Sequence, residues 1–581
     1  MNDIKQQFAF RRLVIAALFL LAMCALLWRA FDLHISSQVF LQKQGDARHI
    51  RTVEVSAHRG NIYDRNGEPL AISTPVDSIW VNPQQIINSV ERLPELAAVL
   101  SVKVEKLQKR LLANSSREFM YVKRRVQPSI AIKVKELGLE GVYLQREYQR
   151  FYPTGEVSAQ VLGFTNVDDK GQEGVELAYN DFLSGVPGAK KIIRDRLGRA
   201  VDDIERIRPA QPGQDLYVSI DKRLQYLAYR SLKATMKKHK AKSASAVVLD
   251  VKTGEVLAMV NQPSFNPNDR SALKPSRTRN RAVTDLFEPG STIKPVTMIA
   301  ALDSGKWKST DSVKTSPGYM RVNGASIKDV RNFGQLSLPA VIYKSSNVGI
   351  SKIALSLSKE QQWHIYRQFG LGQSTGSGFP GEVSGYFDFY KNVTEFERAT
   401  LSFGYGMSVT PLQLTRMYAA IANKGVINPV SFLKLNNKVE GEKIVSEKIA
   451  AALTSMMEKT VSAKGTAMQA SVLNYRVAGK TGTVHKSTAG GYAEDNYQSI
   501  FAGYAPLSDP RLAMVVMVNE PGAGEYYGGV VAAPVFSNVM MNAMRLMDIA
   551  PDKLNLGKVT EKEIQQRRAA AIQSEKDGGR V

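Results

Sequence analysis

An unbroken apolar run from Leu13 to Trp28 is the strongest pattern at the start of the chain. It continues past Arg29 to Phe31, close to the ~20 apolar residues that a helix needs to cross a bilayer core. The long side chain of Arg29 can reach the polar interface, so it does not prevent a span. The pattern predicts one transmembrane helix over residues 13–31, and no later run of comparable length predicts a second.

Charged residues before this run indicate its orientation. Lys5, Arg11 and Arg12 precede it, and basic residues mark the cytoplasmic end of a membrane helix. We therefore expect residues 1–12 to be cytoplasmic and the rest of the chain to be exported. A cleaved signal peptide is the alternative, but the segment from Met23 to Arg29 holds mostly bulky residues where a cleavage site needs small ones.

The first exported region, residues 32–215, mixes short strand patterns with charged helical ones. Asn66-Gly67 stands between apolar segments and predicts the turn of a β-hairpin. Helical patterns dominate Leu93–Val134, without an obvious catalytic cluster. We interpret this region as an α+β spacer or docking module.

The second region, residues 216–550, begins and ends with strand patterns. Ala244–Asp250 and Glu255–Val260 predict an antiparallel hairpin. The patterns that follow predict two helices and then three strands, at Ser291–Asp303, Ala340–Leu357, Val477–Val484, Ser499–Ala505 and Leu512–Asn519. Strands that enclose helices predict an α/β (α+β) domain, with helices packed on an antiparallel sheet. Residues 551–581 are charged and poor in large apolar residues, which predicts a mobile tail.

Composition narrows the possible partners. The formal net charge of +23 favours anionic partners, such as a membrane surface or a lipid-linked substrate, although it is also compatible with general solubility. No basic repeat, Cys/His cluster or RNA-binding aromatic signature supports nucleic acid. Cys24, the single cysteine, lies inside the apolar run, and the six histidines lack metal-site spacing. We expect neither a metal nor a cofactor.

Three short motifs follow one another in the second region: Ser291-Thr292-Ile293-Lys294, Ser345-Ser346-Asn347 and Lys480-Thr481-Gly482-Thr483. Together they match the SxxK, S-D-N and K-T-G set of penicillin-interacting serine enzymes, with Ser346 in place of the middle Asp. Each motif alone is weak, because further copies begin at Ser219, Ser271, Ser356, Ser431, Ser264 and Lys252. The surrounding sequence has to select the functional copies.

The surroundings of Ser291 favour a nucleophile. The turn Phe287–Gly290 precedes it and an apolar helix follows, so its hydroxyl should lie at a helix N-terminus, which favours developing negative charge. Lys294 should lie on the same helix face, one turn along. A lone SxxK serine is more often a simple helix cap, which is the alternative interpretation.

The other two motifs supply binding and relay groups. The strand pattern at Val477–Val484 presents Lys480 and Gly482 to one face and Thr481 and Thr483 to the other. Ser345 and Asn347 could equally be an ordinary helix boundary, so this motif depends on the other two.

Acyl transfer needs residues of these types. A serine hydroxyl needs an adjacent base, and Lys294 can serve if burial and the charge of Lys480 keep it neutral. Ser345 can relay the proton and Asn347 can hold a substrate amide. The backbone N–H groups of Ser291 and Thr483 can form an oxyanion hole, while Lys480 with Thr481 or Thr483 binds a substrate carboxylate and Gly482 permits its close approach.

With these residues in place, the chain resembles class B penicillin-binding proteins, specifically the cell-division (FtsI-type) transpeptidases of Gram-negative bacteria. The resemblance extends from about Ala57 to Met547. It includes Arg59–Gly67, Arg150–Gly155, Phe287–Pro295, Lys344–Gly349 and Gly479–Thr483. It implies a transmembrane helix, an elongated α+β pedestal of the dimerisation type over residues 32–215, and a penicillin-binding/serine β-lactamase-like transpeptidase domain over residues 216–550.

The resemblance also implies the reaction and the partners. Ser291 would attack the penultimate D-Ala carbonyl of a peptidoglycan stem peptide and release the last D-Ala, and the acyl group would then pass to an amine on a neighbouring stem peptide at the division septum. β-Lactam antibiotics would acylate the same serine. Division-complex proteins and a partner glycosyltransferase are implied as partners, with the catalytic domain on the periplasmic side of the inner membrane.

Three other functions remain to be weighed. A serine β-lactamase shares the motifs but must deacylate rapidly, and no deacylating base stands out. A β-lactam sensor or division scaffold should carry a signalling domain, and about twelve residues before the predicted helix are too few for one. An elongation-specific transpeptidase carries the same motifs, so the division role depends on overall resemblance.

Overall fold

The computed structural model describes residues 2–41, 50–194, 200–269, 271, 273–387, 393–437, 439–488 and 491–553. The chain forms two compact units. The first contains Met1–Gly60, Ser73–Gln149 and Ser184–Gln214, and the second contains Asn61–Ile72, Arg150–Leu183 and Asp215–Val581. Because the chain passes repeatedly from one unit to the other, the predicted domain limits at residues 215 and 216 stay a prediction. The predicted mobile tail, from residue 554 onward, lies outside the described residues.

The predicted amino-terminal helix is confirmed as α1 (Asn2–Phe31), followed by a short π-helical turn at Asp32–Ser36. The segment Phe10–Ser36 is long and apolar enough to cross a membrane: an 18-residue stretch of it has a mean hydropathy of 2.3, and none of that stretch is buried against protein. Leucine and alanine dominate it, and these residues lose little side-chain freedom in a helix.

The first unit holds its own hydrophobic core, around helices and strands of residues 73–149. The helical elements are α3 (Pro83–Ile86), η2 (Ile87–Arg92), α4 (Leu93–Leu100), α5 (Val104–Ala113) and α6 (Pro128–Glu136). The helix-rich pattern predicted over Leu93–Val134 is confirmed, with one strand inside it: β4 (Met120–Val126) separates α5 from α6 and pairs with β3 (Pro69–Val81). Met120 and Val122 are buried and the residue between them is only half-buried, which is the two-residue period of a strand. The charged residues of this segment hide that period in the sequence.

A separate antiparallel sheet of the first unit contains β1 (Ile50–Val55), β6 (Gly188–Arg194) and β7 (Ala200–Arg208), in the order β1-β6-β7. The strand β5 (Val142–Phe151) pairs with β3. In the second unit, the predicted hairpin at Asn66-Gly67 is confirmed by the pairing of β2 (Ile62–Tyr63) with β3, and β2 also pairs in parallel with β8 (Leu216–Tyr217).

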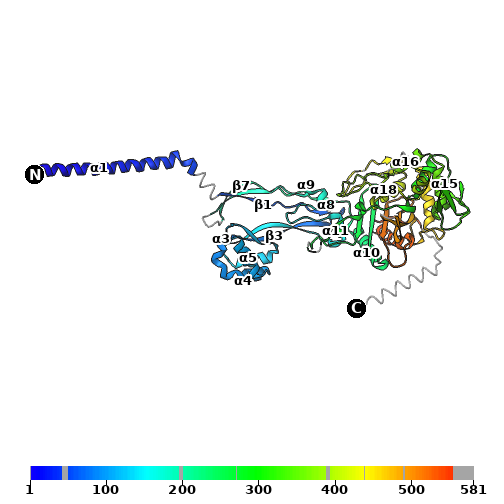
Figure 1. Ribbon diagram of the computed structural model, residues 1–581, viewed down its shortest axis with the longest axis horizontal. Helices are drawn as coiled ribbons and strands as arrows, with labels where there is room; N and C mark the ends of the chain where they lie inside the picture. Colours follow the sequence, from blue (N-terminus) through cyan, green and yellow to red (C-terminus); the bar gives the residue numbers. More distant parts are fainter. Residues whose placement is uncertain are drawn as a thin grey trace. The chain divides into compact units, whose positions relative to one another are not determined.

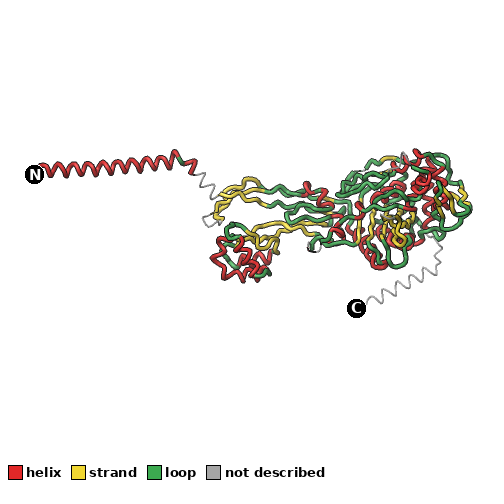
Figure 2. Tube along the Cα trace, in the orientation of Figure 1, coloured by secondary structure: helices red, strands yellow, loops and turns green. Residues whose placement is uncertain are grey.

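The second unit is built on a five-stranded antiparallel sheet in the order β10-β9-β19-β18-β17. All the strands predicted for this region are confirmed, as β9 (Ser243–Asp250), β10 (Val256–Gln262), β17 (Ala478–Thr488), β18 (Gly491–Ala505) and β19 (Leu512–Asn519). In Figure 2 these strands lie among the helices and loops that cover them. The strand β17, which carries the K-T-G motif, is at one edge of the sheet.

Helices cover both faces of this sheet, and Figure 1 labels two of them, α10 (Lys222–His239) and α18 (Pro411–Ala422). On one face lie α10 and α21 (Ala533–Leu546), and on the other lies α18. Every residue of β19 is therefore buried: Ala513 and Val515 face the α18 side, and Met514 and Val516 face the α10 side. Burial on both faces explains why this strand is a continuous apolar run.

The predicted helix at Ser291–Asp303 is confirmed, with a 3-10 first turn, η5 (Gly290–Ile293), that continues into α13 (Lys294–Asp303). The prediction of one helix over Ala340–Leu357 is wrong. Two helices, α14 (Leu338–Tyr343) and α15 (Asn347–Leu355), are separated by a turn in which Ser345 has a left-handed φ of 61°. Ser346 begins the second helix by accepting a hydrogen bond from the Gly349 N–H. The apolar pattern of the sequence therefore continues through this turn, although the helix is interrupted there.

The remaining elements of the second unit are short or peripheral to the sheet. The helices are η3 (Gly155–Val157), α7 (Ala159–Leu162), α8 (Gly174–Ala178), α9 (Asn180–Leu183), α11 (Pro275–Thr278), α12 (Arg281–Thr284), α16 (Lys359–Gln368), α17 (Glu395–Leu401), α19 (Glu447–Glu458), η6 (Lys459–Val461), η7 (Met468–Ala470) and α20 (Gly528–Val531). The strands are β11 (Ser312–Lys314), β12 (Tyr319–Val322), β13 (Ala325–Lys328), β14 (Gln335–Ser337), β15 (Val426–Ile427) and β16 (Glu442–Lys443).

Candidate active site

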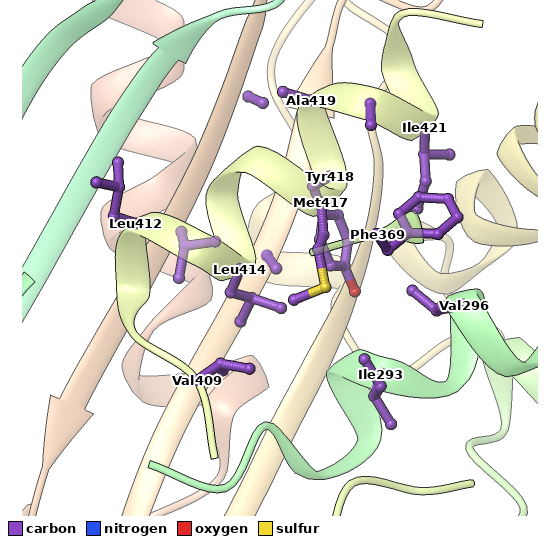
Figure 3. Close-up of a cluster of buried hydrophobic side chains, with 14 of the residues drawn as sticks. Ile293, Val296, Phe369, Val409, Leu412, Leu414, Met417, Tyr418, Ala419 and Ile421 are labelled. Atoms are coloured by element: carbon purple, nitrogen blue, oxygen red, sulfur yellow. The ribbon is translucent and has the colours of Figure 1, made fainter. Parts of the chain in front are cut away.

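The turn that carries Ser291 is fixed by the core beneath it. Figure 3 shows Ile293 and Val296 in one apolar cluster with the side chains of α18. From that helix the Tyr418 hydroxyl donates to the Thr292 carbonyl at 2.8 Å. At Gly290, φ is +54° and a Cβ would lie 2.4 Å from the Val484 side chain, so the turn requires glycine. The half-buried Ser291 hydroxyl is thus held in place by residues on both sides.

The Ser345 hydroxyl joins all three motifs. Its Oγ donates to Ser291 Oγ at 3.0 Å and accepts from Lys480 Nζ at 2.9 Å. Lys294 Nζ lies 3.2 Å from the same oxygen and also donates to the Ser345 carbonyl at 2.6 Å and to Asn347 Oδ1 at 2.7 Å. Among the described hydrogen bonds, Ser291 Oγ contacts Ser345 and not Lys294, so the two residues of the SxxK motif are connected through Ser345.

Both lysines lie in an environment that disfavours charge. Lys294 and Lys480 are fully buried, and the hydrogen-bond partners of their Nζ atoms are hydroxyl, carbonyl and amide oxygens. Burial, and then the charge of Lys480, hold the pKa of Lys294 well below its usual value. Burial alone lowers the pKa of Lys480 to about 7. A lysine with a lowered pKa can accept a proton at neutral pH, which the predicted role of Lys294 requires.

The two faces of β17 are as the alternation predicts. Lys480 points toward Ser345, and a Cβ at Gly482 would lie 3.1 Å from the Thr292 side chain, so this face adjoins the nucleophile turn. On the other face, Thr481 Oγ1 is 2.9 Å from Thr466 Oγ1. Thr483 Oγ1 accepts from the Gly528 N–H at 3.0 Å. Their predicted part in carboxylate binding stays a prediction, and sequence reasoning missed both of these partners.

The other copies of the motifs have structural roles. The Ser219 hydroxyl donates to the Val256 carbonyl, Ser271 to Asp269, Ser356 to the Ile353 carbonyl and Ser431 to the Leu433 carbonyl, while Ser264 donates to the Glu156 carbonyl. Lys252 of the second K-T-G copy forms an ion pair with Asp509 at 2.7 Å. None of these bonds reaches Ser291 or Lys294, so the surrounding sequence selected the copies that meet.

A cleft of about 400 Å³ lies alongside the nucleophile turn. Its lining includes Glu288, Met407, His485 and Lys486. An aromatic row continues from His485, formed by the rings of Tyr497, Tyr526 and Tyr527 with centroid separations of 4.5, 4.0 and 4.6 Å. Such a cleft can hold the parts of an acyl donor that lie beyond the reacting carbonyl.

Asp329 is the residue of this site that sequence reasoning missed most clearly. Its carboxylate accepts hydrogen bonds from the turn that carries Ser345 and Asn347. It belongs to no recognisable motif and lies 16 residues before Ser345, so no local signal marked it. Among the described residues, no group of three or more His, Cys, Asp or Glu side chains could hold a metal ion.

Comparison with protein-family models identifies two matches. Residues 244–541 match the penicillin binding protein transpeptidase domain, and residues 54–218 match the penicillin-binding protein dimerisation domain. These ranges contain all three motifs and the hairpin at Asn66-Gly67.

Curated proteins and solved structures are similar over nearly the full chain. Peptidoglycan D,D-transpeptidase FtsI of Escherichia coli (strain K12) is 43% identical over 558 residues, which are 95% of this chain and 94% of that protein. Probable peptidoglycan D,D-transpeptidase PbpC of Pseudomonas aeruginosa is 40% identical over 94% of this chain and 96% of that protein. A peptidoglycan synthetase from Bifidobacterium adolescentis ATCC 15703 superposes with a TM-score of 0.69 at 27% identity, covering 87% of this chain and 98% of that structure.

Proposed function

The chain belongs to the penicillin-binding-protein family of peptidoglycan D,D-transpeptidases, and from that premise we propose that Ser291 carries the acyl group during cross-linking of stem peptides. One observation supports this assignment above all: the Ser345 hydroxyl contacts Ser291, Lys294 and Lys480 within 3.2 Å. A serine connected to a buried amine by one hydroxyl has the relay that nucleophilic catalysis needs.

The first half-reaction follows from this geometry. The Ser291 oxygen forms a bond to the penultimate D-Ala carbonyl carbon while its proton passes through Ser345 to neutral Lys294. The bond to the terminal D-Ala nitrogen then breaks, and Ser345 delivers the proton to that leaving amine. An ester on Ser291 and free D-Ala result. In the second half-reaction an amine of another stem peptide attacks the ester, and Ser291 recovers its proton.

The remaining motif residues bind the acyl donor in this proposal. Lys480, with Thr481 or Thr483, binds the terminal carboxylate. Burial disfavours a positive charge on Lys480 in the free enzyme, and the bound carboxylate restores that charge. Gly482 allows the donor to lie close to the edge strand β17. Asn347 holds a donor amide, and the backbone N–H groups of Ser291 and Thr483 stabilise the oxyanion. β-Lactams acylate Ser291 by the same route.

A serine β-lactamase would use the same nucleophile, so the fate of the acyl group separates the two enzymes. We expect a penicillin adduct on the protein to persist for many minutes after free drug is removed. A positioned base that activates water is worth about 10²–10⁴-fold in rate, and among the described residues the Ser291 hydroxyl is hydrogen-bonded to Ser345 and to no carboxylate. The measurement is a time course of intact protein mass.

Glu288 provides the matched control for this time course. Its carboxylate lines the cleft and accepts from the Gly406 N–H at 2.8 Å, which makes it the acidic group to test as a deacylating base. The adduct of Glu288→Gln should last as long as that of the wild type. Loss of the wild-type adduct within seconds, with slower loss in Glu288→Gln, would reassign the protein to the β-lactamases.

We also propose the membrane arrangement and the cellular role. Residues 13–31 of α1 are an uncleaved single span of the inner membrane, with residues 1–12 cytoplasmic and the chain after residue 31 periplasmic, because Arg11 and Arg12 precede the apolar segment. Residues 32–215 act as a non-catalytic pedestal and residues 216–550 as the transpeptidase domain. The division role, with division-complex proteins and a glycosyltransferase as partners, rests on resemblance to the FtsI-type family.

A pair of fusions tests this arrangement. Alkaline phosphatase needs disulfides that form only outside the cytoplasm, so a fusion to the C-terminus should be active and a fusion to the N-terminus inactive. A fluorescent protein at the N-terminus should collect at division sites in growing cells. The reverse pattern of phosphatase activity would refute the orientation, and fluorescence spread along the side wall would favour an elongation role.

A further inference from the structure

Asp329 follows β13 and faces the turn between α14 and α15. Its backbone N–H donates to the Gly318 carbonyl at 2.9 Å, which fixes its position. Its Oδ2 accepts from the Ser346 hydroxyl at 2.6 Å, and its Oδ1 accepts from the N–H groups of Asn347 and Val348 at 2.5 and 3.0 Å. One half-buried carboxylate therefore binds three consecutive residues, the last two of the second motif and the residue that follows them.

The turn that Asp329 binds has a strained backbone. Ser345, the residue just before these three, has a φ of 61°, a left-handed conformation that a residue other than glycine keeps only when its surroundings hold it there. The position of its hydroxyl depends on this conformation, and that hydroxyl is what contacts Ser291 and Lys480. A change in the turn would move Ser345 Oγ, the atom that joins the three motifs by hydrogen bonds.

Asn347 provides a second connection from Asp329 to the base. Its N–H is bound by Asp329, its Oδ1 accepts from Lys294 Nζ at 2.7 Å, and its Nδ2 donates to the Lys328 carbonyl at 3.2 Å. The hairpin that ends in Asp329 thus holds both the backbone and the side chain of the residue that orients Lys294.

Charge adds to this geometry. The carboxylate of Asp329 raises the pKa of Lys294, against the larger lowering effects of burial and then of Lys480. From the elements packed on α13, Tyr366 of α16 is neutral because burial raises its pKa to about 12. Lys352 of α15 binds the Lys314 carbonyl, and on α19 Glu447 pairs with Lys424 and Glu458 binds Arg476. Asp329 is therefore the anion that acts on Lys294 among the described groups.

We propose that Asp329 is a positioning residue of the acyl-transfer reaction, which holds Ser345 and Asn347 in place and adds a negative charge to the hydrogen-bond network of Lys294. This inference rests on the proposed function of Ser291 and Lys294. A carboxylate that merely capped α15 would affect the stability of the helix and would leave the pH dependence of acylation unchanged.

Two substitutions separate the position of Asp329 from its charge. In Asp329→Asn, the Oδ1 atom can still accept from both backbone N–H groups, but the negative charge is lost. In Asp329→Ala, both are lost. The measurement is the second-order rate of acylation by a fluorescent penicillin between pH 5 and pH 9, with the melting temperature of each variant determined in the same buffers.

The expected shift has a definite sign. Lys294 must be neutral to accept a proton, so acylation falls as the pH drops through its pKa. Removing the anion lowers that pKa further. The acid limb of the profile, which is the pH range in which the acylation rate falls with falling pH, should therefore move to lower pH in both variants. The plateau rate should stay within about 10-fold of wild type for Asn and fall by about 10²-fold for Ala, because small misplacements of catalytic groups have effects of that size.

Asp311→Asn is the matched control. Asp311 also binds a backbone N–H, that of Lys308 at 2.7 Å, and it contacts no motif residue, so its profile should match wild type. An acid limb unmoved in Asp329→Asn, with the protein folded, would overturn the inference while leaving the function of Ser291 intact. Failure of the wild type to be acylated at Ser291 would instead overturn the function.

Ser346→Ala provides a second test that leaves the charge in place, and it serves if Asp329→Asn does not fold. This substitution removes one of the three hydrogen bonds to the carboxylate, together with the cap that Ser346 provides to the Gly349 N–H. The plateau rate should fall while the acid limb stays at the wild-type pH. A plateau unchanged from wild type would contradict the positioning role.

Discussion

Replacing Ser291 with alanine is expected to abolish labelling by penicillin and to reduce the rate of transpeptidation on the order of 10⁶-fold. Removing the nucleophile from a set of catalytic residues that act together has an effect of this size. The neighbouring hydroxyl cannot substitute for it, because Ser345 is already bound by Lys294 and Lys480. Alanine fits the first turn of the helix, so folding should be retained. Intact-mass spectrometry after exposure to the drug measures the effect, and a thermal melt checks the fold.

Ser356→Ala is the control for this substitution, because Ser356 begins another copy of the SxxK pattern. Its hydroxyl donates to the Ile353 carbonyl and accepts from the Trp307 ring N–H. This variant should label like the wild type. Labelling that survives in Ser291→Ala, or that disappears in a folded Ser356→Ala, would show that the wrong serine has been assigned.

Replacing Lys294 with methionine should slow acylation by about 10²–10⁴-fold, the usual contribution of a general base. Methionine has a similar length and no charge to bury, so the site should stay packed. The acid limb of the pH profile should disappear with the lysine that causes it, while the affinity for a non-reacting ligand with a carboxylate should persist, because that role belongs to Lys480. Rapid-mixing kinetics with a fluorescent penicillin would resolve these quantities.

Lys359→Met is the matched control. Lys359 is the lysine of the SxxK copy that begins at Ser356, and its Nζ donates to the Val393 carbonyl at 3.0 Å. It should acylate at the wild-type rate. A Lys294→Met protein that is folded and acylates at the wild-type rate would mean that another group takes the proton from Ser291.

Local patterns were sufficient to predict the elements that carry the site. The turn before Ser291 and the apolar helix after it are short-range features, and so is the strand around Lys480. Both elements formed as predicted because their residue spacing matches the period of the structure. The sequence order of the motifs then identified the family, although no local rule places residues 291, 345 and 480 together.

The parts that could not be predicted depend on tertiary contacts. The apolar pattern continues through Ala340–Leu357, so nothing in it marks the break at Ser345, which is held by Asp329 from a separate hairpin. Thr466 likewise meets Thr481 only because a loop folds back on the edge strand. Such contacts join residues distant in sequence, and propensity and periodicity carry no information about them.

If Ser291 carries the acyl group, mapping the position of the drug adduct on the chain is the decisive measurement. After brief exposure to a penicillin, the protein is digested with trypsin and each peptide is examined by tandem mass spectrometry for the added mass of one drug molecule. A single modified peptide is expected, with the added mass on Ser291. An adduct on Ser271, Ser356 or any other residue, with Ser291 unmodified, would contradict it.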